Sequence, residues 1–191
     1  MVAGMGKTSS PLSPGTELKS MKQLLLLRHA KSSWDDPDLL DFDRPLSGRG
    51  LRAAPLVGRE LVRRGWLPDL ALVSPALRTR DTWRLVSAEL PAKTPAKFVQ
   101  ALYEASAADV LAKVRQANAA TSSLLVLGHN PGLEEFARRL AGAGSDAAAL
   151  IKLEEKFPTA ALARFVFDGD WARLALGDAR LTHCVWPKDL R

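Results

Sequence analysis

Short apolar runs alternate along this chain with longer segments of helical periodicity. Residues 22–28, 69–74 and 123–129 are apolar runs bounded by polar or turn residues. Runs of this kind are typical of strands that are buried on both faces of a sheet. Residues 160–168 and 181–186 show a similar pattern, so the sequence predicts two further strands near the C-terminus.

Helices are predicted in the segments between these strands, over residues 48–65, 77–90, 107–119 and 131–142. The last segment has an apolar stripe at positions i, i+3, i+4 and i+7, formed by Leu133, Phe136, Ala137 and Leu140. Asn130 suits the N-cap of this helix, and Pro131 suits its first position. Pro55 is expected to kink the first helix or delay its start, because proline lacks the amide proton. Residues 142–145 are expected to be mobile.

The alternation of strands and helices predicts a single α/β domain over residues 21–191. We expect a three-layer sandwich with a mainly parallel central sheet flanked by helices. Residues 1–20 are rich in Ser, Thr, Pro and Gly and lack apolar periodicity, so they are expected to form a disordered N-terminal extension. A phosphate-binding loop ending at Gly6-Lys7-Thr8 is rejected, because the motif needs glycine where the chain has Met1.

The composition of the 191 residues, 47% hydrophobic and 25% charged, is that of a globular protein. Apolar runs such as Leu24–Leu27 are far shorter than the roughly 20 residues of a membrane span, and no secretory signal pattern occurs at the N-terminus. Cys184 is the single cysteine, which excludes an intramolecular disulfide and any multi-cysteine metal site. We therefore expect a cytoplasmic protein without membrane association.

The formal net charge of +6 is concentrated in one block of the sequence. Residues 44–84 contain nine arginines and no lysine against three acidic residues, so 9 − 3 = +6, and the rest of the chain is balanced. This excess favours an anionic partner. Nucleic acid is disfavoured, because no recognised nucleic-acid-binding module is present. The arginines on the first predicted helix are expected to form a solvated face that steers an acidic protein.

Reactive side chains follow three of the predicted strands. Arg28 and His29 end the first strand, Ser74 ends the second with Arg78 one helical turn further on, and His129 ends the third. In open α/β sheets, ligands collect beyond the carboxyl ends of the strands. Each residue alone has a structural explanation, such as a hydrogen-bonded core histidine or a solvated arginine. Together they predict a site at one edge of the sheet.

The chemistry of this set favours a phosphoryl group. A neutral imidazole attacks phosphorus when one ring nitrogen is unprotonated and the other is held by a hydrogen bond. Arginines match the oxygens of phosphate with forked donors and oppose protonation of a nearby histidine. A second histidine at a helix N-terminus adds a donor where the helix dipole favours an anion. Such charge stabilisation requires no metal.

Other chemistries fit the sequence less well. A cysteine phosphatase would need an arginine six residues after Cys184, where Leu190 stands. A zinc hydrolase would need closely spaced ligands, and the three histidines of the chain are far apart in sequence. His183 is interpreted as a structural residue. Trp34 and the aspartates after it are interpreted as a solvated turn.

Four segments resemble, in order, the motifs of one enzyme family. They are Arg28–Lys31, Arg44–Gly50, Ser74–Thr82 and Gly128–Gly132, and Phe157–Ala160 resembles a part of the C-terminal region. They resemble the histidine phosphatase superfamily, and most closely its small bacterial phosphohistidine phosphatases of the SixA type, over about residues 22–190. The resemblance implies a phosphoglycerate mutase-like fold and a phosphatase that uses neither a metal nor a cofactor.

The resemblance also implies roles for individual residues. His29 would be the nucleophile that becomes transiently phosphorylated. Arg28 and Arg78 would bind the phosphoryl oxygens, and His129 would stabilise the transferring group from the other side. Arg44 would be an additional anion contact.

Glu104 stands where larger relatives place a proton donor, although the motif around it differs; alternatively it is a surface carboxylate near a helix start. An alkoxide leaving group needs a proton, whereas the imidazole of phosphohistidine departs with less help. The expected substrate is therefore a phosphorylated protein, such as a histidine phosphotransfer domain, ahead of a small phosphate ester. A non-catalytic module that binds phosphoproteins is the alternative from another class.

Overall fold

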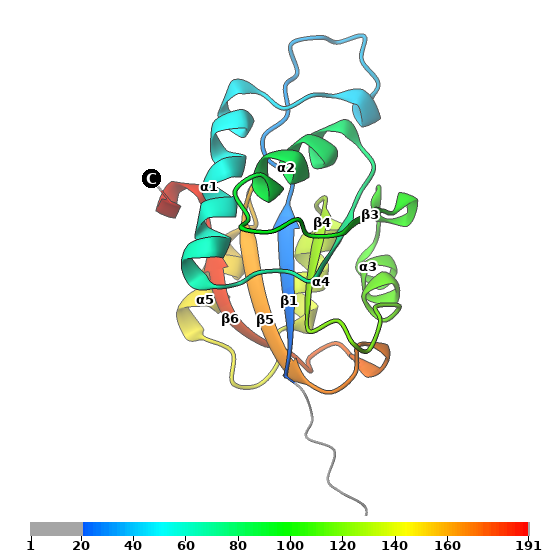
Figure 1. Cartoon of the computed structure of the whole chain (residues 1–191), viewed down its shortest axis with the longest axis vertical. Coiled ribbons are helices and arrows are strands. Elements are labelled where there is room, and N and C mark those ends of the chain that lie inside the picture. Colours follow the sequence, from blue (N-terminus) through cyan, green and yellow to red (C-terminus); the bar gives the residue numbers. More distant parts are fainter. Residues whose placement is uncertain (1–20, 191) are drawn as a thin grey trace, which may run out of the picture.

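The computed structural model describes residues 21–190, and the predicted extension over residues 1–20 lies outside them. The strands are β1 (Met21–Arg28), β2 (Leu70–Val73), β3 (Ala96–Phe98), β4 (Ser123–Gly128), β5 (Leu162–Asp168) and β6 (Arg180–Val185). The α-helices are α1 (Gly48–Arg64), α2 (Leu77–Ser87), α3 (Ala107–Val114), α4 (Gly132–Leu140) and α5 (Ala147–Glu155) (Figure 1). Within this part of the chain, no helix is both long and apolar enough to span a membrane.

The strands form one sheet in the order β3-β2-β4-β1-β5-β6. The first four strands of this order are mutually parallel, whereas β5 pairs antiparallel with β1 and with β6. Crossover helices place the carboxyl ends of β1, β2 and β4 at one edge of the sheet, the upper one in Figure 1. The predicted α/β sandwich with a mainly parallel central sheet is confirmed.

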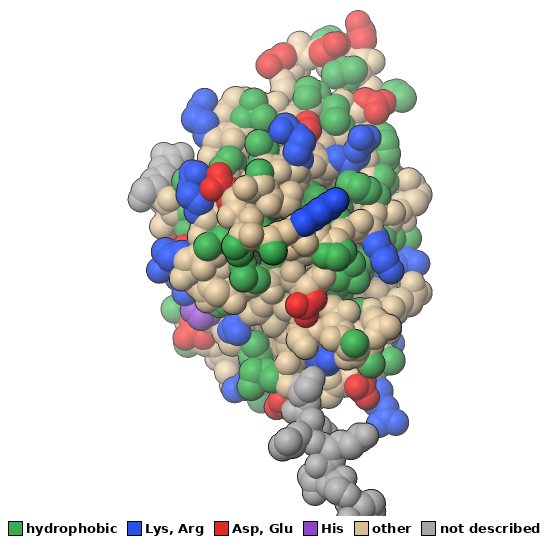
Figure 2. Space-filling model, viewed as in Figure 1, with side chains coloured by type: hydrophobic (Ala, Val, Ile, Leu, Met, Phe, Trp, Pro, Cys, Tyr) green, Lys and Arg blue, Asp and Glu red, His purple; other side chains and the backbone are tan. Residues whose placement is uncertain are grey.

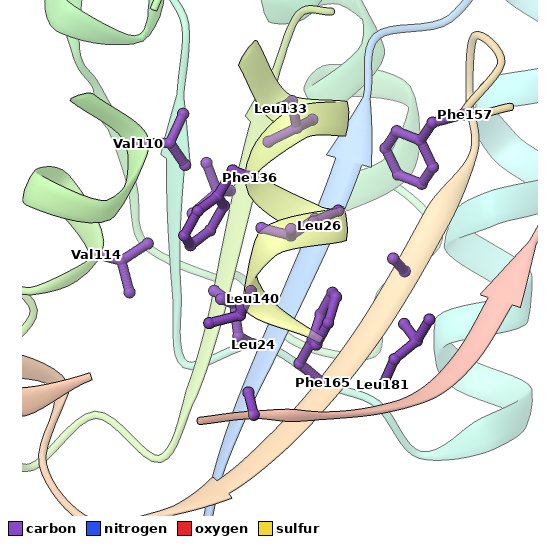
Figure 3. Packing of buried hydrophobic residues seen from close by; sticks show 14 of the residues in the cluster. Leu24, Leu26, Val110, Val114, Leu133, Phe136, Leu140, Phe157, Phe165 and Leu181 are labelled. Carbon is purple, nitrogen blue, oxygen red and sulfur yellow. The ribbon is translucent and has the colours of Figure 1, made fainter. Parts of the chain in front are cut away.

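Helices cover both faces of the sheet, because neighbouring leucines of β1 point to opposite sides. Leu24 and Leu26 pack in a core with α3, α4 and α5, of which Figure 3 shows Val110 and Phe136. Leu25 and Leu27 pack in a second core with α1 and α2. All four leucines are fully buried, and each buried side chain of this size contributes about 1.5–3 kcal/mol. The two cores hold β1 rigidly in the middle of the molecule.

Two elements are missed by the sequence pattern. Strand β3 has only three residues and two of them are exposed, so it has no apolar run to reveal it. Helix α5 begins after residues 142–145, which were expected to be mobile. The Ser145 hydroxyl accepts from Leu181 N of β6, and Asp146 then caps α5 through Ala149 N; the mobility of residues 142–145 stays a prediction.

Two helices end earlier than predicted, and the first is not delayed by its proline. Helix α2 ends at Ser87, before Pro91, because the residue preceding a proline disfavours helical geometry. Helix α3 ends at Val114, and the Asn118 side chain then accepts from Ala120 N in a turn. Helix α1 runs from Gly48 through Pro55, so the expected delay is wrong; Ser47 caps its first turn.

The start of α1 packs against the chain just after β1. Ser47 donates its hydroxyl proton and its amide proton to the Lys31 carbonyl oxygen, and a Cβ added at Gly50 would lie 2.2 Å from that oxygen. We expect Gly50→Ala to destabilise the fold by about 1–3 kcal/mol through overpacking, measured as the free energy of unfolding in urea. Gly48→Ala is the matched control, because its Cβ would meet only the Arg52 side chain at 3.5 Å. Equal stability of the two variants would contradict this interpretation.

Candidate active site

The two histidines predicted to meet do so at the carboxyl edge of the sheet. Arg28 of β1 stands in register with Gly128 of β4, so His29 and His129 leave adjacent parallel strands side by side. Their ring centroids are 5.1 Å apart. Residues one hundred positions apart in sequence thus share one site.

His29 is held in one tautomer by the backbone. Its ring is 8% exposed, and Nδ1 lies 2.8 Å from the carbonyl oxygen of Ala30. Since a carbonyl oxygen only accepts, Nδ1 carries the proton and Nε2 keeps its lone pair. Burial lowers the pKa of His29 to about 3, and the charge of Arg78 acts in the same direction. The side chain is therefore neutral at physiological pH and has a free nucleophilic nitrogen.

Thr82 of α2 fixes the loop that carries His29. Its hydroxyl oxygen accepts from Ala30 N at 3.0 Å and donates to the Arg78 carbonyl at 2.6 Å. Thr82 is completely buried. The nucleophile loop and the helix that carries Arg78 are thus bound to each other.

Arg28 is positioned by the segment before β5. Its Nη1 donates to the Phe157 carbonyl at 2.9 Å, and Asn130 Nδ2 donates to the same oxygen at 2.9 Å. Asn130 also donates to Glu134 of α4, so the prediction that it caps α4 with its side chain is wrong. The amide bridges α4 to residue 157 instead. Burial lowers the pKa of Arg28 below its usual range, while the charge of Glu134 opposes this shift.

The guanidinium of Arg78 faces the loop between β1 and α1. It donates to both the backbone oxygen and the carboxylate of Asp41, with 2.8 Å between Nη2 and Oδ2. The same carboxylate accepts from Arg44 at 3.0 Å and from the Tyr103 hydroxyl at 2.9 Å. Although partial burial acts to raise it, hydrogen bonds from these three side chains lower the pKa of Asp41 to about 2. Asp41 therefore remains charged.

Asp41 and Tyr103 are site residues that the sequence patterns did not reveal. Asp41 lies three residues before Arg44, in a loop whose aspartates looked like a solvated turn, and acidic side chains do gather at the tip of that loop (Figure 2). Trp34 in this loop is 71% exposed, yet the Arg44 guanidinium carbon lies 3.1 Å from its ring centroid. The donors of Arg44 also reach Ser32 and Ser33, so in this structure Arg44 braces the loop.

His129 completes the group of side chains around His29. Its Nε2 lies 2.7 Å from the Ser74 hydroxyl oxygen, and burial followed by the charge of Arg78 lowers its pKa to about 4. His129 Nδ1 and Arg28 Nε are buried without a hydrogen-bond partner among the described residues. An unpaired buried polar atom costs about 1–3 kcal/mol, and an anion oxygen between these side chains would relieve that cost.

Glu104 lines the cavity that opens beside His129. The cavity has a volume of about 690 Å³ and is also bordered by Arg78, Asp41 and Tyr103. The Glu104 side chain is exposed and its backbone is left-handed, with φ of 53°. Of the predicted site residues it shares the cavity with Arg78 and His129, and it has no hydrogen-bond partner among the described residues that would orient it. Over residues 21–190, no three His, Cys, Asp or Glu side chains are grouped so as to hold a metal ion.

The lowered pKa values of the two site histidines predict an unusual titration. In an NMR titration of the histidine ring signals, neither His29 nor His129 is expected to show an inflection between pH 5 and 8. The His29 signal is assigned by its absence from the His29→Asn variant. The unfolded chain binds these protons near pH 6.5, so folded stability falls as pH drops from 6.5 towards 3–4. An inflection of either signal near pH 6.5 would contradict the burial-based account.

The carboxylate of Asp41 occupies the donors that a phosphate dianion would use. We expect Asp41→Asn to tighten competitive inhibition by inorganic phosphate about tenfold, because it removes a competing charge; hydrogen bonds to charged groups contribute about 1.5–3 kcal/mol. Asp43→Asn is the control, since Asp43 lies in the same turn without a side-chain partner among the described residues. Weaker phosphate inhibition in Asp41→Asn would instead show that Asp41 orders Arg78 for binding.

The fold, with two histidines and two arginines grouped at the carboxyl edge of its sheet, is that of a phosphatase class. The model of the histidine phosphatase superfamily (branch 1) matches residues 24–122, and the chain belongs to that superfamily. The matched segment contains the first three motifs, whereas His129 lies beyond it. The prediction of the family from its ordered motifs is confirmed.

Curated relatives and solved structures extend this result over most of the chain. An uncharacterized protein of Mycobacterium tuberculosis is 38% identical over 162 residues, 81% of this chain and 96% of the relative. An uncharacterized chloroplastic protein of Arabidopsis thaliana is 39% identical over 140 residues, 69% of this chain but only 63% of that relative.

The structure of a candidate phosphohistidine phosphatase SixA from Nakamurella multipartitia has a TM-score of 0.74 and 30% identity, and covers 88% of this chain and 97% of its own. The protein histidine phosphatase SixA complexed with tungstate has a TM-score of 0.71 at 23% identity and supports the fold. The match covers 88% of this chain and 99% of that one. A phosphoglycerate mutase from Plasmodium falciparum shares the fold, with a TM-score of 0.57 at 15% identity. The match covers 86% of this chain and 90% of that one.

Proposed function

We propose that this protein hydrolyses phosphohistidine on protein substrates, without a metal, through a phosphohistidine intermediate at His29. The observation that carries the proposal is the fixed tautomer of His29. Its Nδ1 proton is bound to the Ala30 carbonyl, so Nε2 is left unprotonated beside two arginines and a second histidine. His129 is also neutral and close to the arginines, but its ring is bound to the Ser74 hydroxyl rather than fixed by the backbone.

The reaction would proceed in two transfers at phosphorus. His29 Nε2 attacks the phosphoryl group, the bond from phosphorus to the substrate imidazole breaks, and that imidazole takes up a proton from solvent. Water then attacks phosphorus and releases one proton to solvent, the bond to His29 Nε2 breaks, and inorganic phosphate leaves. Arg28, Arg78 and His129 would hold the equatorial oxygens, whose charge they stabilise in both transition states.

The protein substrate is favoured by the state of the carboxyl groups that line the cavity beside His129. Glu104 is exposed and has no hydrogen-bond partner among the described residues, and Glu135 is exposed and paired with Arg139. Asp41, with a pKa of about 2, holds no proton to donate. An alkoxide leaving group depends on such a donor, whereas an imidazole depends on it less. Similarity to proteins described as SixA phosphohistidine phosphatases supports the same substrate class.

A small phosphate ester is the second candidate, and one observation favours it. Glu104 lines the same cavity as Arg78 and His129, so a bound ester could bring its leaving oxygen to the carboxyl group. In that case Glu104→Gln would reduce hydrolysis of an alkyl phosphate and leave phosphohistidine hydrolysis unchanged.

A hydrolysis panel in excess chelator tests the proposal. The substrates are a histidine-phosphorylated protein, an aryl phosphate and several alkyl phosphates. We expect the phosphoprotein to have the highest kcat/KM, with no loss on addition of chelator. Faster turnover of an alkyl phosphate, or complete inactivation by chelator with recovery on metal addition, would overturn it. Binding of the phosphoprotein without release of phosphate would indicate a non-catalytic binding module.

A further inference from the structure

A second cavity lies at the same edge of the sheet as His29, on the side of β5 and β6. It has a volume of about 700 Å³ and is bordered by the first half of α1, the segment before β5 and the chain just after β6. It shares no lining residue with the cavity beside His129. We call it the basic pocket, after its charged lining residues Lys31, Arg49, Arg52, Lys156 and Lys188.

The register of the sheet gives the separation between the basic pocket and the nucleophile. Leu27 of β1 pairs with Leu162 of β5, which pairs with Val185 of β6. Because β6 runs parallel to β1, Trp186 follows β6 at the level at which Arg28 ends β1. Two strand spacings of about 4.8 Å separate them, so the Trp186 side of the pocket lies roughly 10 Å from β1.

The segment before β5 connects the basic pocket to the nucleophile loop. Pro158 and Thr159 line the basic pocket. Their neighbour Ala160 donates its amide proton to the backbone oxygens of Arg28 and His29. The wall of the pocket is therefore bonded directly to the nucleophile loop.

Positive charge in the basic pocket is largely unpaired. No carboxylate lines it, and among its five cations only Lys156 has an ion pair within residues 21–190, with Glu155 at 3.1 Å. The ammonium groups of Lys156 and Lys188 lie 5.0 and 4.4 Å from the Trp186 ring centroid. Like charges gathered in this way repel one another, so an anion entering the pocket would be attracted.

Apart from Thr159, the rest of the lining is apolar. It includes Ala53 and Leu56 of α1 and, just after β6, Trp186 and Pro187. An occupant that fits both parts of the lining has carboxylates next to apolar groups. This composition is that of an acidic protein segment with hydrophobic residues rather than that of a nucleic acid.

We propose that the basic pocket docks an acidic segment of the phosphoprotein substrate. This inference rests on the proposed function, and it adds the feature by which a protein substrate is recognised. A small phosphate ester is not expected to fill both cavities, because they share no lining residue and the Trp186 side of the pocket is roughly 10 Å from β1. A helix can reach both, since two turns span about 10.8 Å and place an acidic side chain that far from a phosphohistidine on the same face.

Charge reversal in the basic pocket tests this inference with two substrates. In Arg49→Glu/Arg52→Glu, we expect kcat/KM for a histidine-phosphorylated acidic protein domain to fall at least about tenfold at low ionic strength, since charge steering changes association rates 10–10³-fold. Hydrolysis of an aryl phosphate is expected to stay within about twofold, which also shows that the variant is folded. High salt is expected to narrow the difference between wild type and variant.

Lys93→Glu/Lys97→Glu is the matched control, with the same change in net charge. Both lysines are exposed, and they lie at β3, the opposite edge of the sheet from β6. An equal loss in the two double variants, no loss in the pocket variant, or a parallel loss of aryl phosphate hydrolysis would each overturn the docking inference alone. A wild-type protein that leaves the phosphoprotein intact would overturn the proposed function as well.

Discussion

Replacing His29 by alanine is expected to reduce kcat by a factor of at least about 10⁴, because removal of a nucleophile eliminates the covalent route altogether. No other described side chain offers an unprotonated, backbone-fixed nitrogen at this edge of the sheet. The arginines and His129 would still bind substrate, so KM is expected to change much less than kcat. Steady-state kinetics with an aryl phosphate and with a phosphoprotein measure both quantities.

His183→Ala is the control for this experiment. The ring of His183 packs edge-on against Trp66 at 4.7 Å between centroids, and it lies on β6, away from the nucleophile loop. Its removal is expected to lower stability modestly and to leave kcat within about threefold. A His29→Ala protein that is folded and retains more than about a tenth of the wild-type kcat would refute the nucleophile assignment.

Replacing Arg78 by alanine is expected to reduce kcat/KM by about 10²–10³, the usual cost of removing one donor to a charged transition state. Arg78 is 6% exposed and its guanidinium donates to Asp41, so it is held in place before substrate arrives. Arg78→Lys is expected to recover only part of the loss, because an ammonium cannot form two parallel hydrogen bonds. Affinity for orthovanadate, measured by inhibition, should fall in parallel.

Arg80 provides a matched comparison for Arg78. It lies two residues further along α2 and is exposed, whereas Arg78 is buried. Arg80→Ala is expected to keep kcat/KM within about twofold. A comparable loss in both variants would mean that Arg78 acts only through the general positive charge of α2.

Much of the site could be predicted because parallel strands bring distant residues together in a regular way. The apolar runs that end at Arg28 and Gly128 identify buried strands, and adjacent parallel strands present their next residues at one edge. Local pattern and topology therefore sufficed to place His29 beside His129. Arg78 followed from its position one turn into a helix.

The contacts that could not be predicted depend on loop conformation. Asp41 meets Arg78 across 37 residues and Tyr103 across 62, and no periodicity connects these positions. The bridging role of Asn130 depends on Phe157, a residue 27 positions away. Such polar contacts are set by the folded shape of loops, which hydrophobic patterning does not specify.

The arginine block of residues 44–84 has several structural roles rather than one. Arg63 and Arg64 bind the largely buried Glu60, and Arg59 pairs with Glu89, so these three charges are partly neutralised within the fold. The expected solvated, steering face of the first helix is therefore reduced to its first half. There, Arg49 and Arg52 line the basic pocket.

The central claim, that the phosphoryl group passes to His29, is tested most directly by trapping the intermediate. The protein is mixed with phosphoprotein carrying labelled phosphate, quenched in alkali during turnover, and digested for peptide mapping. The account predicts a label that survives alkali, is lost in acid, maps to the peptide containing His29 and is absent from the His29→Ala protein. Turnover by the wild-type protein with no labelled His29, or with an alkali-labile label on another residue, would contradict it.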